Sequence, residues 1–183
     1  EKLGSDDLGY GPFRSGFDSF RGLFRFRTFA SCRSYDAPTE VRCGSVQDLR
    51  AEWMMGDAGH AGLFGTADGI EDWAVQIFRA YHGKDVQISD QVARLFFDWK
   101  SSEPRFLGGF DRPTPPSQAG SHFPNTTVGH LGFTGTSFWM DLESGARVSL
   151  LGHRFSEGYD PERLRQLRPD FHDWLWDEVF RKL

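Results

Sequence analysis

The residues best suited to chemistry lie in segment 130–134, which reads His-Leu-Gly-Phe-Thr. An imidazole on a strand can face a polar ligand, and Gly132 lets a ligand lie against the backbone. Gly129 precedes His130, and glycine weakens a strand, so two flanking glycines suggest a close approach at this point. We therefore expect His130 to contact a substrate. A strand histidine whose hydrogen bonds are satisfied by neighbours is the alternative.

The elements around this segment are predicted to form an antiparallel meander. Two runs of β-prone residues, Thr126 to Phe133 and Thr136 to Asp141, flank Thr134-Gly135. A glycine in a two-residue connection supplies the positive φ of a tight hairpin. A third β-prone run, Arg147 to Arg154, follows the turn-forming residues 143–145.

Two helices and a short strand are predicted before the meander. Thr66 can cap a helix from Ala67 to about Tyr81, and Ser89 can cap one over Asp90 to Trp99. A proline-rich connection follows, with a short strand at Arg105 to Asp111. The side chains of the second helix that are expected to face inward are Val92, Leu95, Phe96 and Trp99.

The C-terminal residues predict a helix in two pieces. Asp160-Pro161 begins it, with aspartate as the cap and proline at the first helical position. Pro169 is expected to break the helix, and Asp170 can cap the second piece. The apolar face of that piece is predicted to contain Phe171, Trp174, Leu175, Val179 and Phe180.

Three segments resemble one enzyme family, the serine β-lactamases and penicillin-binding-protein-like hydrolases. They are Val128 to Asp141, Ala58 to Asp68 and Leu167 to Asp173. The resemblance is closest to the branch that carries His-x-Gly where other members carry Lys-Thr-Gly. It implies an α+β fold, with an antiparallel sheet flanked by helices, of the β-lactamase/DD-peptidase kind.

The resemblance also implies roles for the residues of the motif. In the family, this motif lies on the strand that walls the active site. His130 would face the substrate, Gly132 would let the substrate lie against the strand, and the backbone N–H of Phe133 would help bind the oxyanion. Leu131 and Thr134 would be substrate-binding neighbours.

A second His-x-Gly pattern, His60-Ala61-Gly62, lies in a predicted loop before a helix. An imidazole that bonds the loop backbone is one interpretation. A substrate contact at the rim of the site is the other.

The family's other two motifs are missing from the chain. No lysine has a serine three positions before it, so Ser-x-x-Lys does not occur. The only asparagine, Asn125, follows Phe123 at the spacing of the Tyr-x-Asn motif, so that motif is missing too. We expect no meaningful hydrolysis by this chain alone. Neither a Gly-x-Ser-x-Gly elbow nor a phosphate-binding glycine loop is present to support another enzyme class.

Two functions remain open. In the first, the chain is the C-terminal part of a serine hydrolase acting on a β-lactam, a peptidoglycan-type peptide or an ester. An N-terminal chain or fragment would bring Ser-x-x-Lys and would cover the strand at Arg147 to Arg154, which is otherwise an exposed edge. In the second, the chain is a non-catalytic binding or scaffold module.

Composition excludes several other classes. With 183 residues and a formal net charge of -5, the chain is expected to form a single unit and gives no electrostatic case for nucleic acid. Within it, residues 1–125 would supply helices and loops, and residues 126–183 the meander and the terminal helix. No apolar run reaches membrane-span length. The six histidines are scattered, so neither a metal nor a cofactor is expected.

The start of the chain and the cysteines bear on processing and on the cellular compartment. The chain opens at Glu1 without methionine or a signal-peptide pattern, which suggests a processed or cut end. The family resemblance implies a periplasmic or secreted protein. Cys32 and Cys43 are compatible with a disulfide or with two thiols. Aromatic residues make up 15% of the chain, and those from Phe13 to Arg27 predict a short helix or loop and then a strand.

Overall fold

The computed structural model describes residues 8–10, 30–34, 37, 39–56, 58–84, 87–98, 105–155 and 160–182. The chain divides into two compact units. The first contains residues 1–73 and 155–159, and the second contains residues 74–154 and 160–183. The prediction for residues 13–27 lies outside the described residues, and the expectation of a single unit stays a prediction.

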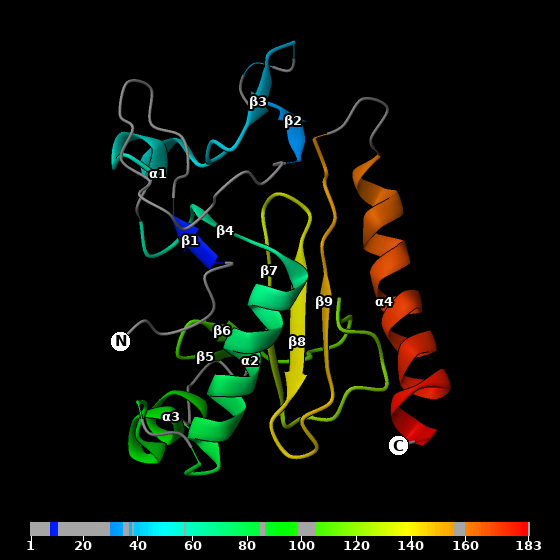
Figure 1. Ribbon diagram of the computed structural model, residues 1–183. Helices are drawn as coiled ribbons and strands as arrows, with labels where there is room; N and C mark the ends of the chain where they lie inside the picture. Colours follow the sequence, from blue (N-terminus) through cyan, green and yellow to red (C-terminus); the bar gives the residue numbers. More distant parts are fainter. Residues whose placement is uncertain are drawn as a thin grey trace. The chain divides into compact units, whose positions relative to one another are not determined.

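The second unit is built on a five-stranded antiparallel sheet whose strands pair in chain order (Figure 1). The strands are β5 (Phe106–Leu107), β6 (Phe110–Asp111), β7 (Thr127–Leu131), β8 (Ser137–Asp141) and β9 (Arg147–Leu150). The predicted meander is confirmed as β7, β8 and β9, although β7 and β9 end before the predicted boundaries.

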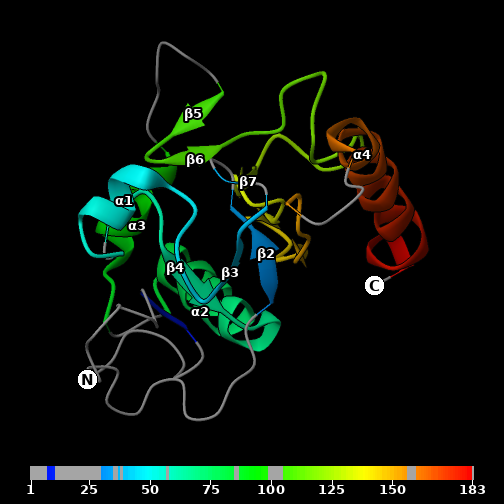
Figure 2. The ribbon, with the colours of Figure 1, turned by 90° about the horizontal axis from the view of Figure 1, so that it is seen from above.

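The single strand expected at residues 105–111 is instead a hairpin. β5 and β6 pair with each other across Gly108-Gly109, both of which have positive φ. Figure 2 shows this hairpin beside β7. β6 pairs with β7 through one residue pair, Asp111 with Gly129, so the hairpin covers only part of the edge of β7.

The connection between β7 and β8 is a three-residue loop and not the predicted two-residue turn. The N–H of Gly132 donates to the carbonyl of Thr136 over 2.8 Å, which closes a loop of Phe133, Thr134 and Gly135. The N–H of Gly135 donates to the carbonyl of Gly132 over 3.0 Å. Gly135 has a φ of +116°, so it does supply the positive φ that the sequence predicted.

One face of this sheet packs against α4 (Pro161–Glu178), which runs alongside β9 in Figure 1. The Trp139 side chain of β8 is buried together with Ala119 and Phe123. Trp176 of α4 and Phe180 of the short 3-10 helix η1 (Phe180–Lys182) pack against this cluster. The loop before β7 and the C-terminal helices therefore share one core.

Helix α4 continues through Pro169, so the predicted break and the predicted cap at Asp170 are wrong. Proline has no N–H to bond the carbonyl four residues earlier, which here belongs to Arg165. The side-chain amide of Gln118 donates to that carbonyl over 3.1 Å. A residue of the preceding loop thus replaces the hydrogen bond that Pro169 cannot make.

The N-caps that the sequence predicts are confirmed. Asp160 caps α4 and Ser89 caps α3 (Asp90–Phe97). The hydroxyl of Thr66 accepts from the N–H of Gly69 at the start of α2 (Ala67–Tyr81).

The buried helix faces differ from the prediction. Val92, Leu95 and Phe96 of α3 are exposed, whereas Ala93 and Phe97 are buried. The Phe97 ring packs 5.1 Å from that of Phe110 on β6. Trp99 lies outside the described residues. On the last helical segment Trp174 and Val179 are also exposed, whereas the other three predicted residues, Phe171, Leu175 and Phe180, are half-buried.

The first unit contains two small β-ribbons and one short helix. β1 (Leu8–Tyr10) pairs with β4 (Leu63–Gly65), β2 (Ser31–Arg33) pairs with β3 (Val41–Cys43), and α1 spans Leu49–Trp53. The register sets Cys32 opposite Arg42 and Ser31 opposite Cys43. Among the described helices, none combines the length and apolar character that a membrane span requires.

The carboxylate of Asp141 holds the turn between β8 and β9. It accepts hydrogen bonds from the hydroxyls of Thr126 and Ser144 and from the N–H groups of Glu143 and Ser144. Burial alone would raise the pKa of Asp141, but these donors outweigh it and hold the pKa below its ordinary value. The folded state therefore stabilises the ionised carboxylate of Asp141 relative to its protonated form.

Replacing Asp141 with asparagine should destabilise the protein by about 1–3 kcal/mol at pH 7, because charge-assisted hydrogen bonds are lost. The lowered pKa means that this stabilisation is present above about pH 4 and disappears as the pH falls through the folded-state pKa. Urea unfolding at pH 7 and at pH 3 measures both effects. The exposed Asp170→Asn is the control and should change neither; an Asp141→Asn penalty that is as large at pH 3 as at pH 7 would contradict this account.

The bond from Gln118 to the Arg165 carbonyl predicts an energetic coupling with Pro169. Gln118→Ala should cost about 1 kcal/mol, because it leaves that carbonyl without its donor. In a Pro169→Ala background the restored N–H can bond the carbonyl, so the same change should cost less. A double-mutant cycle measured by urea unfolding tests this, and additive effects would show that Gln118 does not substitute for the missing N–H.

Candidate functional site

The hydrogen bonds of the β7–β8 hairpin determine where the backbone of the His130 strand points. Gly132 bonds to Thr136, and the carbonyl of Thr126 accepts from the N–H of Leu142. Antiparallel pairing alternates, so the even-numbered residues of β7 direct their N–H and C=O groups toward β8. The odd-numbered residues, including Leu131, direct theirs toward the β6 side.

Among the strands that the structure describes, none pairs with β7 on the β6 side at Leu131. β6 reaches β7 only at the pair of Asp111 and Gly129, two residues before Leu131. Within the described residues, no strand pairs with β7 beyond that point. The backbone groups of Leu131 therefore face a strand edge that an extended ligand can use.

His130 lies beside this edge and differs from most of the other histidines. Its side chain is exposed, and no described residue bonds to it. His60 contacts Asp48, His82 bonds the Leu142 carbonyl, and His172 bonds the Gln118 carbonyl. The side chain of His130 is thus available to a ligand.

Two residues that the sequence did not suggest lie in line with His130. Cross-strand pairing places His130 opposite Phe138, and Phe138 opposite Ser149. Residues paired in this way project on the same face, so the three side chains form a row across β7, β8 and β9. Phe138 and Ser149 are half-buried, and this row is the opposite face from the one that packs on α4.

The glycines that flank His130 are explained by the protein's own packing. A Cβ at Gly129 would collide with the Trp139 ring and the Phe138 carbonyl, and one at Gly132 would collide with the Thr136 hydroxyl. The close approach expected from the sequence is therefore made by β8. The roles predicted for Gly132 and for the other motif residues toward a substrate stay predictions.

The loop that follows presents Phe133 and Thr134 differently. The Phe133 side chain is half exposed, and the Arg154 guanidinium lies 4.7 Å from its ring centroid. The carbonyl of Thr134 accepts a hydrogen bond of 2.7 Å from the N–H of Arg154. Residues just after β9 thus support the loop that carries the predicted oxyanion donor.

His60 belongs to the other unit and has a contact of its own. Its Nε2 lies 3.1 Å from the Asp48 carboxylate, which caps α1 by accepting from the N–H of Ala51. That backbone N–H, and then His60, hold the pKa of Asp48 below its ordinary value. The imidazole contacts a side chain rather than the loop backbone, and its substrate role stays a prediction.

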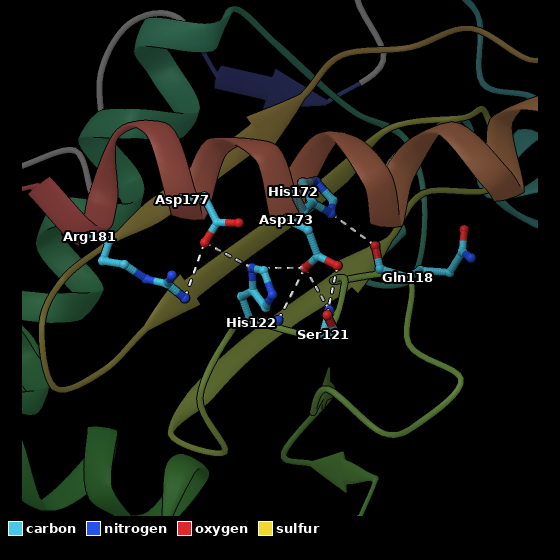
Figure 3. Close-up of polar contacts among 7 residues, drawn as sticks. All are labelled: Gln118, Ser121, His122, His172, Asp173, Asp177 and Arg181. Atoms are coloured by element: carbon cyan, nitrogen blue, oxygen red, sulfur yellow. Dashed lines mark hydrogen bonds and ion pairs between the residues drawn. The ribbon is translucent and has the colours of Figure 1, made fainter.

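A Ser-His-Asp set that the sequence reasoning missed lies where loop 117–122 meets α4 (Figure 3). The Ser121 hydroxyl donates to Asp173 over 2.8 Å, and the N–H groups of Ser121 and His122 also donate to that carboxylate. His122 faces Asp177 at 3.3 Å and makes no bond to Ser121. A nucleophile must bond to its base, so the set fastens the loop and does not form a catalytic triad.

The pKa shifts of His172 and Asp173, which bond loop 117–122 to α4, agree with a structural role for this contact. Burial lowers the pKa of His172, so its neutral imidazole is the stable form at neutral pH. Burial would raise the pKa of Asp173, but the donors from Ser121 and His122 outweigh it and lower the pKa. The described residues contain no cluster of histidine, cysteine, aspartate or glutamate that could hold a metal ion.

Comparison with known proteins supports the fold. No protein-family model matches the chain. N-acetylmuramyl-L-alanine amidase of Bacillus subtilis (strain 168) is 30% identical over 130 residues, covering 68% of this chain and 30% of the amidase. A solved β-lactamase of Mycobacterium bovis matches with a TM-score of 0.51 and 18% identity, over 64% of this chain and 46% of that one. The chain thus spans less than half the length of either protein, and its fold is the β-lactamase-like α+β arrangement that the sequence predicted.

Proposed function

We propose that this chain is the C-terminal part of a β-lactamase-fold hydrolase that cleaves amide bonds by acyl transfer. The open edge of β7 beside the exposed His130 carries the proposal. An extended substrate can pair with the backbone of Leu131, while the imidazole contacts a polar group of the substrate. The N–H of Phe133 then donates to the developing oxyanion.

The nucleophile and its base come from an N-terminal segment or from a second chain. No Ser-x-x-Lys motif occurs in these 183 residues. One oxyanion donor contributes about 3–4 kcal/mol to the transition state, whereas loss of a serine nucleophile or its base costs on the order of a million-fold in rate. This chain alone is therefore expected to be inactive.

The proposed substrate is an amide of the bacterial cell wall. The amidase that resembles this chain is named for N-acetylmuramyl-L-alanine, and the similar solved structure is titled a β-lactamase. Acyl transfer to a serine uses the same activated nucleophile and oxyanion donor for linear and for cyclic amides, so one site can serve either. Thr134 is proposed as a rim contact of the site beside His130, and a substrate role for His60 in the first unit is proposed separately. A cell-wall substrate would be met in the periplasm or outside the cell.

A non-catalytic binding module is the second candidate. The absence of Ser-x-x-Lys from these 183 residues favours it. Without a nucleophile from elsewhere, the β7 edge and His130 could bind an amide but could not cleave it. Such a module would bind the same amides without cleaving them.

Native mass spectrometry of the protein from its source, before and after denaturation, separates the two candidates. The hydrolase predicts a Ser-x-x-Lys serine on the same polypeptide or on a tightly bound one, which a fluorescent penicillin labels covalently. A single species of 20.8 kDa that remains unlabelled would overturn the hydrolase and leave the binding module.

His130→Ala in the assembled protein tests the role of the imidazole. We expect kcat/KM to fall about 100-fold, while the free energy of unfolding changes by less than about 0.5 kcal/mol because the side chain is exposed. His82→Ala is the matched control, since that exposed imidazole bonds the Leu142 carbonyl and has no part in the proposed site; it should leave turnover unchanged. Unchanged turnover in His130→Ala would remove His130 from the site.

A further inference from the structure

A buried arginine of α4 reaches the β7–β8 loop. Arg168 is 6% exposed, and its Nη2 donates to the carbonyls of Gly135 and Thr136, the latter over 3.1 Å. It lies in segment 167–173, which the proposed function leaves without a role. Burying a charge costs free energy, and apolar side chains of similar volume often stabilise a core equally well. Packing alone therefore does not explain why a guanidinium is present.

Both residues whose carbonyls Arg168 binds, Gly135 and Thr136, take part in the hydrogen bonds of the loop, Thr136 through the same carbonyl and Gly135 through its N–H. The Thr136 carbonyl also accepts from the N–H of Gly132, and the Gly132 carbonyl accepts from the N–H of Gly135. Together with the guanidinium, these bonds constrain the backbone before Phe133, at Gly132, and after it, at Gly135 and Thr136. The orientation of its peptide N–H therefore depends on contacts that α4 helps to hold.

Helix α4 is itself fixed at the level of Arg168. His172 bonds the Gln118 carbonyl, and Asp173 accepts from Ser121 and His122 one helical turn further on (Figure 3). A guanidinium anchored in this way has a defined position relative to the loop, as a preorganised site requires.

We propose that Arg168 is a positioning residue for oxyanion binding. It holds the peptide N–H of Phe133 in its working orientation through the Gly135 and Thr136 carbonyls. The inference rests on the proposed function, because it assumes that Phe133 is the oxyanion donor. It adds to the proposed function that Arg168 of α4, which is not assigned any contact with substrate, controls the chemical step.

Variants of Arg168 in the assembled protein separate positioning from mere stability. Lysine keeps the charge but lacks the planar fork that can serve two carbonyls, and methionine removes the charge at similar length. The matched controls are Arg163→Lys and Arg163→Met, because Arg163 is exposed on the same helix. Rates should be measured at temperatures where every variant is folded, as judged by circular dichroism.

The kinetic readout is the split between kcat and KM for an amide or penicillin substrate. We expect kcat to fall about 100-fold in Arg168→Met, with a smaller fall in Arg168→Lys, because small misplacements cost about that much. KM should change less than about threefold, and the Arg163 controls should match wild type. A fall in stability with unchanged kcat would show that Arg168 is only structural and would overturn the proposal.

Amide hydrogen exchange by NMR in the same protein gives a readout that does not depend on activity. In Arg168→Met the N–H groups of Gly132 and Gly135 should exchange about tenfold faster than in wild type, while those of β8 should not. Unchanged exchange would overturn the positioning role even if kcat falls. A wild-type protein that no penicillin labels would instead overturn the proposed function, so the two failures are distinguishable.

Discussion

The contact between the Arg168 guanidinium and the carbonyls of Gly135 and Thr136 joins α4 to the β7–β8 hairpin of the sheet. Without it, α4 would touch the sheet through apolar packing around Trp139, which is not directional. Hydrogen bonds to two carbonyls fix the helix in register with the loop. The same β7–β8 hairpin sets the register that places His130, Phe138 and Ser149 in a row on the other face of the sheet.

Local signals in the sequence predicted much of the fold, and long-range contacts limited the rest. The caps at Thr66, Ser89 and Asp160 act within one helical turn, so their residue types suffice. The predicted break at Pro169 was wrong because Gln118, which is distant in the sequence, supplies the hydrogen-bond donor that proline lacks. The inward face of α3 was also wrong, since Phe97 and not Phe96 meets β6.

The candidate site was predicted only in part, because the hairpin loop is one residue longer than expected. A two-residue turn would pair His130 with Trp139, whereas the observed loop pairs it with Phe138. One residue of register moves a neighbour to the other face, so Phe138 and Ser149 could not be found beside His130 from the sequence. Gly129 marks a close approach, as expected, but the approaching group is the Trp139 ring.

The strand order β5-β6-β7-β8-β9 has a consequence for how this part of the protein is made. Every strand of this sheet pairs with its neighbour along the chain, so the longest loop that a pairing closes is the one between β6 and β7. Low contact order favours fast folding, and such a sheet can assemble in the order in which a ribosome releases it. The slower steps are then those that bring α4 back onto the finished strands.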